Sequence, residues 1–229
     1  IDLGALTAAA EMTGEALKAA DGDDRHLVVV KSTITPPGVG AVREALRAGA
    51  GDAADRVELA TNPEFLREGA AVDDFQHPDK LVFGAESDWA TERLERLYEP
   101  LVAAADTDVS VIRTDPETAV MIKYGNNAFL ASKISLANDL GNICKQFGID
   151  AYEVMDAVGL DDRIGAKFLR SGVGWGGSCF PKDVDAIRAA AREAGYEPPM
   201  LDAAVAVNDG QPERMLELLD SHVDVAGER

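Results

Sequence analysis

One segment, between residues 114 and 148, restricts the fold of this chain more than any other. Thr114-Asp115-Pro116-Glu117 supplies an N-cap, a first-turn proline and the glutamate of a capping box. No further proline follows before Gly148, and glycine is typical of a helix end. Apolar side chains recur between them at helical intervals, among them Val120, Phe129, Ile134 and Ile143. The segment therefore predicts one long helix and a domain boundary near residue 114.

The residues before this helix alternate between helical and strand patterns. Helical periodicity covers 3–20, 39–48 and 87–104, and short apolar runs cover 27–30, 57–60, 81–83 and 109–112. Strands that alternate with helices predict an α/β domain with a parallel sheet. We assign residues 1–113 to this domain.

The residues after the long helix carry helical patterns only, at 151–158, 183–194 and 199–209. Together with the long helix they predict an all-α domain over residues 114–210. We interpret residues 211–229 as the start of a linker toward a further domain.

The chain is strongly acidic, with 41 acidic against 22 basic residues and a formal net charge of −19. This charge argues against nucleic acid and anionic membranes as non-specific partners. Abundant alanine and few aromatic residues, combined with this acidity, indicate adaptation to high salt, with an ordinary acidic cytosolic protein as the alternative. The sequence contains no apolar run long enough for a membrane span and no signal peptide, so we expect a cytoplasmic protein.

The cysteines and histidines do not form a metal-binding pattern. Cys144 and Cys179 belong to no CxxC pair, which also makes a disulfide framework improbable. His26, His77 and His222 are scattered and lack the spacing of a zinc motif. We therefore expect no metal ion.

A glycine-rich segment, residues 172–177, matches the pattern G-x-G-x-x-G of dinucleotide-binding turns. Such a turn requires a hydrophobic strand immediately before it, whereas Lys167-Phe168-Leu169-Arg170-Ser171 precedes this one inside a helical region. We interpret it instead as a flexible loop whose bare backbone lies against a ligand.

This loop leads into Cys179, which lies near the start of the next predicted helix. Backbone N–H groups and the helix dipole favour a thiolate there, and Lys182 adds to the effect. Asp183, four residues on, is expected on the same helical face, where it could orient a water or a lysine. The alternative for Cys179 is a buried structural thiol, which is the interpretation that we give Cys144.

Three further segments place polar residues where a site could form. Lys123 and Asn127 are spaced i, i+4 in the long helix, so they project from one face. Residues 62–69 and 31–38 follow predicted strands, and the carboxyl ends of parallel strands are where α/β sheets bind ligands. Solvated side chains and ordinary loops remain the alternative for each segment alone.

Taken together, these segments resemble the UDP-glucose/GDP-mannose dehydrogenase family, and most closely its UDP-glucose branch. The resemblance covers nearly the whole chain. It rests on Lys31-Ser32-Thr33, Asn62-Pro63-Glu64-Phe65-Leu66-Arg67-Glu68-Gly69, Lys123 with Asn127-Ala128-Phe129-Leu130, Arg163-Ile164-Gly165, and Gly176-Gly177-Ser178-Cys179-Phe180-Pro181-Lys182-Asp183.

The resemblance implies a four-electron oxidation of a nucleotide sugar. Cys179 would attack the aldehyde formed by the first hydride transfer, and water would cleave the thioester formed by the second. Lys123 would be the general acid/base near the sugar O6, and Asn127 would stabilise charge on that oxygen. Asp183 and Glu64 would manage water and protons during hydrolysis.

The same resemblance implies the ligands and the partner of the chain. The cofactor would be NAD, two per sugar, with contacts at Ser32, Thr33, Glu68 and Lys182. A nucleotide sugar would contact Phe65, Leu66, Arg163, Arg170, Gly172, Gly174 and Gly176. Arg163 would reach the substrate of a neighbouring subunit, so a homodimer built on the long helix is expected.

The implied fold is a partial Rossmann-like parallel sheet followed by an all-α dimerisation domain. The family opens with a strand and a glycine-rich turn and closes with a second α/β domain, and neither is present here. We therefore expect an internal fragment with little activity by itself. Arg170 lies in a loop position that varies among relatives, which leaves the choice of sugar open.

Two alternatives stay open. One is the same chemistry on GDP-mannose or a UDP-N-acetylhexosamine, although residues 163–165 and 179–183 look more like the UDP-glucose branch. The other is a non-catalytic dimerisation or binding module. Cys179, Lys123 and Asp183 argue against such a module, because binding alone needs no thiolate.

Overall fold

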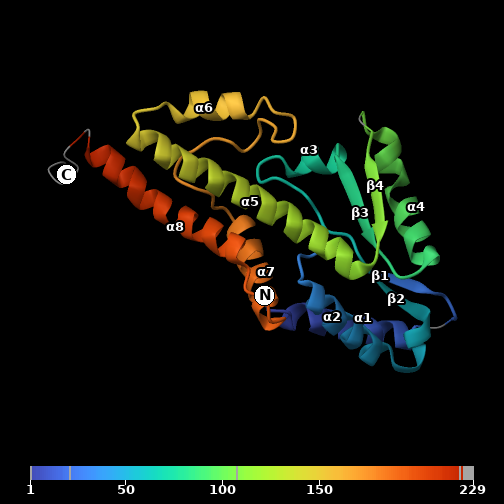
Figure 1. The fold of residues 1–229 in the computed structure, drawn as a ribbon. Helices are drawn as coiled ribbons and strands as arrows, with labels where there is room; N and C mark the ends of the chain where they lie inside the picture. Colours follow the sequence, from blue (N-terminus) through green and yellow to red (C-terminus); the bar gives the residue numbers. More distant parts are fainter. Residues whose placement is uncertain (1, 21, 107, 222, 224–229) are drawn as a thin grey trace. The chain divides into compact units, whose positions relative to one another are not determined.

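The computed structural model describes residues 2–20, 22–106, 108–221 and 223, which leaves His222 and the end of the predicted linker outside the described residues. The chain divides into two compact units, Ile1–Lys123 and Tyr124–Arg229 (Figure 1). The division falls inside a long helix, α5 (Pro116–Gln146). The boundary near residue 114 stays a prediction.

The first unit is built on a four-stranded sheet in the order β1-β2-β3-β4. The strands are β1 (His26–Val30), β2 (Val57–Thr61), β3 (Lys80–Gly84) and β4 (Ser110–Thr114). β1 pairs with β2 and β3 with β4 in parallel, which confirms the predicted α/β class with a mostly parallel sheet.

The pair β2 and β3 departs from the predicted parallel arrangement. These strands are antiparallel and meet only at Thr61 and Gly84. Their connection carries only the six-residue α3 (Ala71–Gln76), whereas a parallel crossover usually needs a helix long enough to cover the strand.

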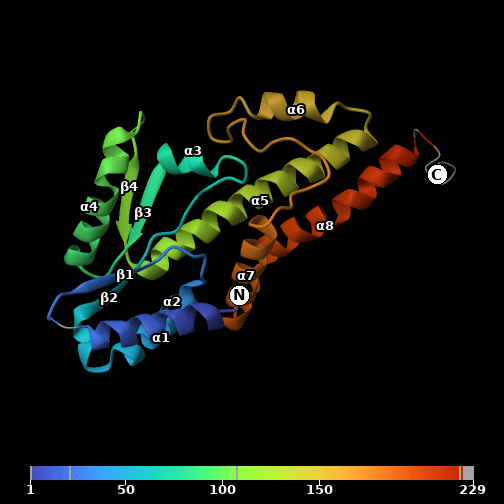
Figure 2. The same cartoon turned by 180° about the vertical axis from the view of Figure 1, so that it is seen from behind.

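Helices cover both faces of this sheet (Figure 2). Val28 and Val30 of β1 pack into a core with α1 (Gly4–Ala19) and α2 (Pro36–Ala50), whereas the alternate residues Leu27 and Val29 pack into a core with α4 (Asp88–Ala104). The short 3-10 helix η1 (Gly51–Arg56) connects α2 to β2. This two-sided burial explains why the predicted strand was a continuous apolar run.

The start of α5 is anchored to the end of the sheet. Asp115 caps it by accepting a hydrogen bond from the Thr118 N–H at 2.8 Å, so the capping side chain is Asp115 rather than Thr114. The Thr61 hydroxyl donates to the Pro116 carbonyl at 3.0 Å. A Cβ at Gly84 would lie 2.3 Å from the Thr61 hydroxyl oxygen, so only glycine allows this approach.

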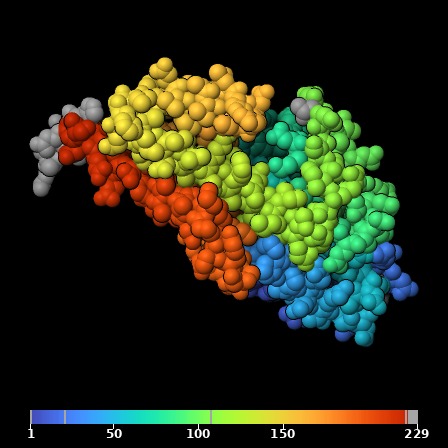
Figure 3. All heavy atoms as spheres, in the orientation of Figure 1, coloured from blue at the N-terminus to red at the C-terminus, as the bar shows by residue number. Residues whose placement is uncertain are grey.

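Among the described residues of the second unit, the regular secondary structure is helical only. It contains the rest of α5, α6 (Ala151–Val158), α7 (Phe180–Glu193) and α8 (Pro199–Asp220). α8 lies along α5 (Figure 3). Two side chains of α5 donate hydrogen bonds to α8, the Ser135 hydroxyl to the Ala204 carbonyl at 2.7 Å and the Asn142 amide to the Gln211 side-chain oxygen at 2.7 Å. α5 ends before Gly148, whose φ of 68° allows the Ile149 N–H to bond back to the Cys144 carbonyl.

The helix predicted to end at 209 continues to Asp220. Pro212 lies inside it, and the fully buried Gln211 ties it to α5 and to the loop at Gly172. These tertiary contacts outweigh the local cost of a proline. The linker role of residues 211–229 stays a prediction. In the part of the chain that the structure describes, no helix combines the length and apolar character needed to cross a membrane.

Candidate functional site

Polar side chains gather at the carboxyl ends of β1 and β2. Asn62 is almost fully buried and donates to the Val82 carbonyl at 2.9 Å, while its own oxygen accepts from Lys31 Nζ at 2.9 Å and from the Tyr98 hydroxyl. Lys31 also donates to the Tyr98 hydroxyl oxygen at 3.2 Å. The network fixes the chain directly after β1 and β2. The carboxyl ends of parallel strands form the edge of the sheet where ligands bind.

The buried Lys123 and the partly exposed Glu64 form an ion pair beside this network. Lys123, which is 3% exposed, donates to the Glu64 carboxylate at 2.8 Å and to the Glu64 carbonyl at 2.7 Å. Burial raises the pKa of the Glu64 carboxyl. Hydrogen bonds from Lys123 and the Leu66 N–H, together with the charges of Lys123 and Lys31, lower it, and the pKa lies below its usual 4.5.

The predicted neighbours of Glu64 lie on the same loop. The Leu66 N–H donates to the Glu64 carboxylate at 2.7 Å, and Lys80 stands over the Phe65 ring, 4.4 Å from its centroid. Lys123 Nζ lies 5.6 Å from the same centroid. The loop therefore surrounds the amine with a carboxylate, a carbonyl and an aromatic face.

The candidate cofactor contacts of the first unit lie near this edge of the sheet. Ser32 and Glu68 are exposed, and Thr33 is half-buried. Ser32 and Thr33 follow β1 and Glu68 follows β2, so their positions in the chain bring them to this edge of the sheet.

In the second unit, Cys179 is the N-cap residue of α7. Its carbonyl accepts the first helical hydrogen bond, from the Asp183 N–H at 2.9 Å, so Asp183 lies one turn after Cys179 as predicted. The thiol is partly exposed, and the Ser178 hydroxyl lies 3.7 Å from Sγ. Cys144, by contrast, is buried in α5.

Asp183 is a buried carboxylate, 1% exposed, that α5 supports. Asn127 Nδ2 donates to its Oδ2 at 2.7 Å, while the exposed Lys182 forms an ion pair with Oδ1 at 3.3 Å that makes no hydrogen bond. Tyr124, one turn before Asn127, is also buried, and its hydroxyl has no hydrogen-bond partner among the described residues. Burial and the negative charge of Asp183 both raise the pKa of Tyr124.

The glycine loop before Cys179 is held through its main chain. Asn208 accepts from the Trp175 N–H at 2.6 Å and donates to the Trp175 carbonyl at 3.0 Å. Asn138 accepts from the Gly172 N–H at 2.7 Å, and Gln211 donates to the Gly172 carbonyl at 2.8 Å. The loop predicted to be flexible is therefore clamped between α5 and α8.

The three glycines of this loop that are candidate substrate contacts differ in their surroundings. Gly174 has a φ of 99°, and a Cβ there would lie 2.5 Å from the Asn208 side-chain oxygen. A Cβ at Gly172 or Gly176 would meet nothing within 4 Å. The clamp thus requires glycine at one position, and the other two leave bare backbone.

The two candidate arginines are exposed and paired locally. Arg163 binds Asp161 at 2.7 Å, and Arg170 pairs with Asp156 at 3.1 Å. Lys133 of α5 donates to the carbonyls of Ile164 and Gly165, which fixes the backbone beside Arg163.

The candidate residues thus form two groups, one in each unit. Glu64, Phe65 and Leu66 gather around Lys123, and Asn127 joins Asp183 next to Cys179. Sequence reasoning did not select the groups that support them. These are Asn62 and Tyr98 in the first unit and Tyr124, Asn138, Asn208 and Gln211 in the second. Asn138 and Asn208 could have been noticed as asparagines inside helices, where asparagine is disfavoured without a function.

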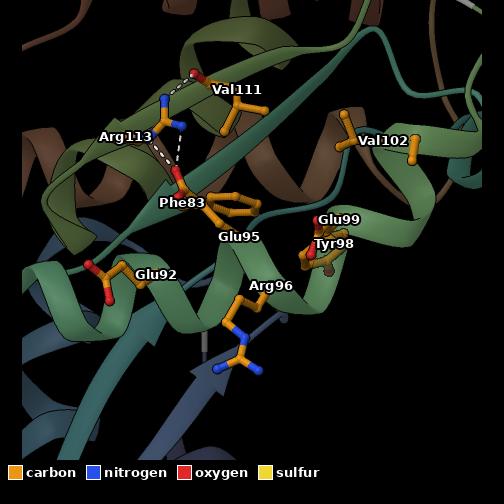
Figure 4. Close-up of a pocket in the computed structure, with 10 residues that line it drawn as sticks. Phe83, Glu92, Glu95, Arg96, Tyr98, Glu99, Val102, Val111 and Arg113 are labelled. Carbon is orange, nitrogen blue, oxygen red and sulfur yellow. Dashed lines mark hydrogen bonds and ion pairs between the residues drawn. The ribbon is translucent and has the colours of Figure 1, made fainter.

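A hollow of about 530 Å³ lies elsewhere in the first unit, between α4 and the strands β3 and β4 (Figure 4). Phe83, Tyr98 and an ion pair between Arg113 and Glu95 line it. It contains none of the candidate residues, so it does not contribute to the two groups.

Comparisons with known proteins show the family of the chain. Residues 1–102 match the NAD binding domain of the UDP-glucose/GDP-mannose dehydrogenase family, and residues 117–210 match its central domain. UDP-glucose 6-dehydrogenase AglM of Haloferax volcanii is 57% identical over 100% of this chain and 53% of its own length. UDP-glucose 6-dehydrogenase TuaD of Bacillus subtilis is 41% identical over 92% of this chain and 43% of its own length.

Two solved structures are similar in fold as well as sequence. A UDP-glucose dehydrogenase from Pyrobaculum islandicum has a TM-score of 0.85 and 39% identity, covering 96% of this chain and 49% of its own. A GDP-mannose dehydrogenase from Pseudomonas aeruginosa has a TM-score of 0.62 and 34% identity, covering 96% and 50%. The chain spans about half the length of the curated relatives it matches.

Proposed function

Because the chain belongs to the UDP-glucose/GDP-mannose dehydrogenase family, we propose that it serves the NAD-dependent oxidation of UDP-glucose to UDP-glucuronate. The reaction converts R–CH2OH, two NAD⁺ and water into R–COO⁻, two NADH and three protons. The observation that carries the proposal is Cys179 at the start of α7, one turn before a buried Asp183 that Asn127 holds. A module that only binds a nucleotide sugar needs no such thiol.

The cofactor fits the polar edge of the sheet in the first unit. Ser32 and Glu68 are exposed there and Thr33 is half-buried, beside the carboxyl ends of two parallel strands. Lys182, an exposed cation next to Asp183, is the proposed cofactor contact in the second unit. When bound, NAD accepts one hydride in each of the two oxidations.

Lys123 and Asn127 serve the sugar oxygen. As its amine, Lys123 takes the hydroxyl proton when the first hydride leaves the carbon, which gives an aldehyde. Glu64 holds the resulting ammonium, through the bonds at 2.7 and 2.8 Å. The two side chains belong to one helix and are one turn apart, which supports a shared role at O6.

Cys179 then supplies the covalent step. Its thiolate adds to the aldehyde carbon, a C–S bond forms, and the carbonyl oxygen becomes an alkoxide that Lys123 and Asn127 stabilise. Loss of the second hydride from this carbon gives a thioester. A water then attacks the thioester carbonyl, the C–S bond breaks with the thiolate leaving, and Asp183 and Glu64 receive protons from the water.

The nucleotide sugar is proposed to contact the glycine loop and the arginines. Gly172, Gly174 and Gly176 present main chain that the Asn208 and Gln211 clamps fix. Arg163 and Arg170 offer exposed guanidinium groups suited to a diphosphate or to sugar hydroxyls. UDP-glucose is preferred over GDP-mannose because the relatives at 57% and 41% identity are named UDP-glucose 6-dehydrogenases.

The test is to count NADH formed per sugar, by absorbance at 340 nm, with the protein as its gene encodes it in high salt. Two NADH per UDP-glucose would support the proposal, and one would mean that oxidation stops at the aldehyde. Activity with GDP-mannose or a UDP-N-acetylhexosamine, and none with UDP-glucose, would change the substrate and keep the chemistry.

The covalent role is tested by Cys179→Ser, with Cys144→Ala as the matched control. We expect the first variant to lose formation of the carboxylate and the control to keep it, because Cys144 is a buried packing residue. Unchanged turnover in Cys179→Ser would show that the thioester route is wrong.

We propose also that the protein is a homodimer through α5. Large apolar side chains stand exposed along this helix at seven-residue intervals: Phe129 at 72%, Leu136 at 59% and Ile143 at 47%. This spacing places them on one stripe, as expected for a helix that packs against a second copy. Sedimentation of Phe129→Glu/Ile143→Glu should show a monomer, and an unchanged dimer would place the interface elsewhere.

A further inference from the structure

Asp183 Oδ1 and the Tyr124 hydroxyl are among the buried polar atoms that have no hydrogen-bond partner among the described residues. Both side chains are 1% exposed. A buried carboxylate oxygen without a donor is costly, and so is a buried hydroxyl without a partner. Asp183 Oδ1 therefore lacks a donor, and the Tyr124 hydroxyl can supply one.

The helices that carry these residues place them on facing surfaces. Tyr124 and Asn127 are three residues apart on α5 and so share one side of the helix. Asn127 already reaches Asp183 on α7, where its amide donates to Oδ2 at 2.7 Å. The same side of α5 thus offers one donor that is bonded to the carboxylate and a second whose proton has no acceptor.

We propose that Tyr124 is a positioning residue for Asp183: its hydroxyl is connected to Oδ1 through one buried water, to which it donates. Asn127 on Oδ2 and Tyr124 on Oδ1 would then hold the carboxylate in one orientation one turn from Cys179. The inference rests on the proposed function, in which Asp183 takes a proton from the water that attacks the Cys179 thioester.

The electrostatics agree with this direction of donation. The pKa of Tyr124 is raised by burial and by the charge of Asp183, so the phenol keeps its proton and acts as a donor. Lys182 does not replace it, because its side chain is half-exposed and its 3.3 Å contact with Oδ1 makes no hydrogen bond.

The consequence is confined to one step of the reaction. In hydrolysis, the water oxygen bonds to the thioester carbon, the C–S bond breaks toward Cys179, and a water proton passes to Asp183. A carboxylate that has lost one of its two donors rotates and receives this proton less efficiently. The two oxidations need no water, so they should proceed as before.

The experiment uses Tyr124→Phe in the protein as its gene encodes it, with Tyr196→Phe as the control. Phenylalanine keeps the buried ring and removes only the hydroxyl, whereas Tyr196 is 63% exposed. We expect kcat to fall about tenfold in Tyr124→Phe with kcat/KM unchanged, so that KM falls together with kcat, and a rapid burst of two NADH per active site to remain. Intact mass spectrometry at steady state should show a sugar adduct on Cys179 accumulating in this variant.

A second variant separates positioning from structural damage. Asp183→Asn should accumulate the same adduct, and Tyr124→Phe should add little to its defect, because both changes act on one proton transfer. Unchanged kcat in Tyr124→Phe, or a loss of the burst together with kcat, would overturn the assignment. Absence of an adduct in every variant, with Cys179→Ser still active, would instead overturn the thioester route on which the inference rests.

Discussion

The two groups of polar residues stabilise buried charge in different ways. In the first unit, Lys123 and Glu64 compensate each other directly, with contacts of 2.7 and 2.8 Å. In the second, Asp183 is only 1% exposed but is hydrogen-bonded by a neutral amide, and its ion pair with Lys182 reaches only 3.3 Å. An ion pair whose cation is buried, as Lys123 is, is screened less by salt than a pair of exposed side chains. A carboxylate held by dipoles depends instead on the geometry of its donors.

Removal of the cation from the first group should give the largest effect. In Lys123→Ala we expect kcat to fall by about 10²- to 10⁴-fold, the usual contribution of a positioned acid/base, measured as NADH formation. Lys145→Ala, an exposed lysine on the same helix, is the control and should stay near wild type. Equal activity in the two variants would mean that the ion pair is structural only.

A substitution that removes hydrogen bonds in the second unit, without removing a charge, should lower the free energy of unfolding. Asn208→Ala removes both hydrogen bonds to the Trp175 main chain, and we expect a loss of about 1–3 kcal/mol in the free energy of unfolding. Urea unfolding in high salt measures it, and Asp209→Ala, an exposed neighbour, is the control. A change below about 0.5 kcal/mol would show that the clamp contributes little.

The smallest expected effect is the pH dependence of the first group. Because the pKa of Glu64 is lower in the folded protein than its usual 4.5, its ionised form stabilises the fold above that pH. This contribution disappears as the pH falls through the folded value. The stability difference between wild type and Glu64→Gln should therefore be about 1 kcal/mol or less at neutral pH and shrink in acid. If the stability difference between the two proteins grew as the pH fell, the pKa of Glu64 would be raised in the folded protein rather than lowered.

Much of the fold could be predicted because local signals and tertiary contacts agree. The cap at Asp115 and the glycine at 148 bound α5, and the apolar run of β1 reflects burial on both faces. The extension of α8 to Asp220 could not be predicted, since Pro212 argues for an end and only the burial of Gln211 explains the continuation.

The candidate site could be predicted only in part, for a related reason. The i, i+4 spacing placed Lys123 and Asn127 on one side of α5, and the helical pattern that begins at residue 183 placed Cys179 near a helix start. Which acid each of them meets depends on packing between distant segments: Glu64 lies 59 residues from Lys123 and Asp183 lies 56 from Asn127. The helical and strand periodicities of the sequence do not indicate which distant residues are paired.

The clamp on the glycine loop has a consequence for how this molecule could change over generations. Asn138, Asn208 and Gln211 bind main-chain atoms of the loop, so the path of the loop does not depend on most of its side chains. Val173, which is 68% exposed, and Arg170 can therefore be exchanged while the backbone keeps its course. Substitutions at the surface of this loop can therefore change which ligand it binds with little loss of folding stability.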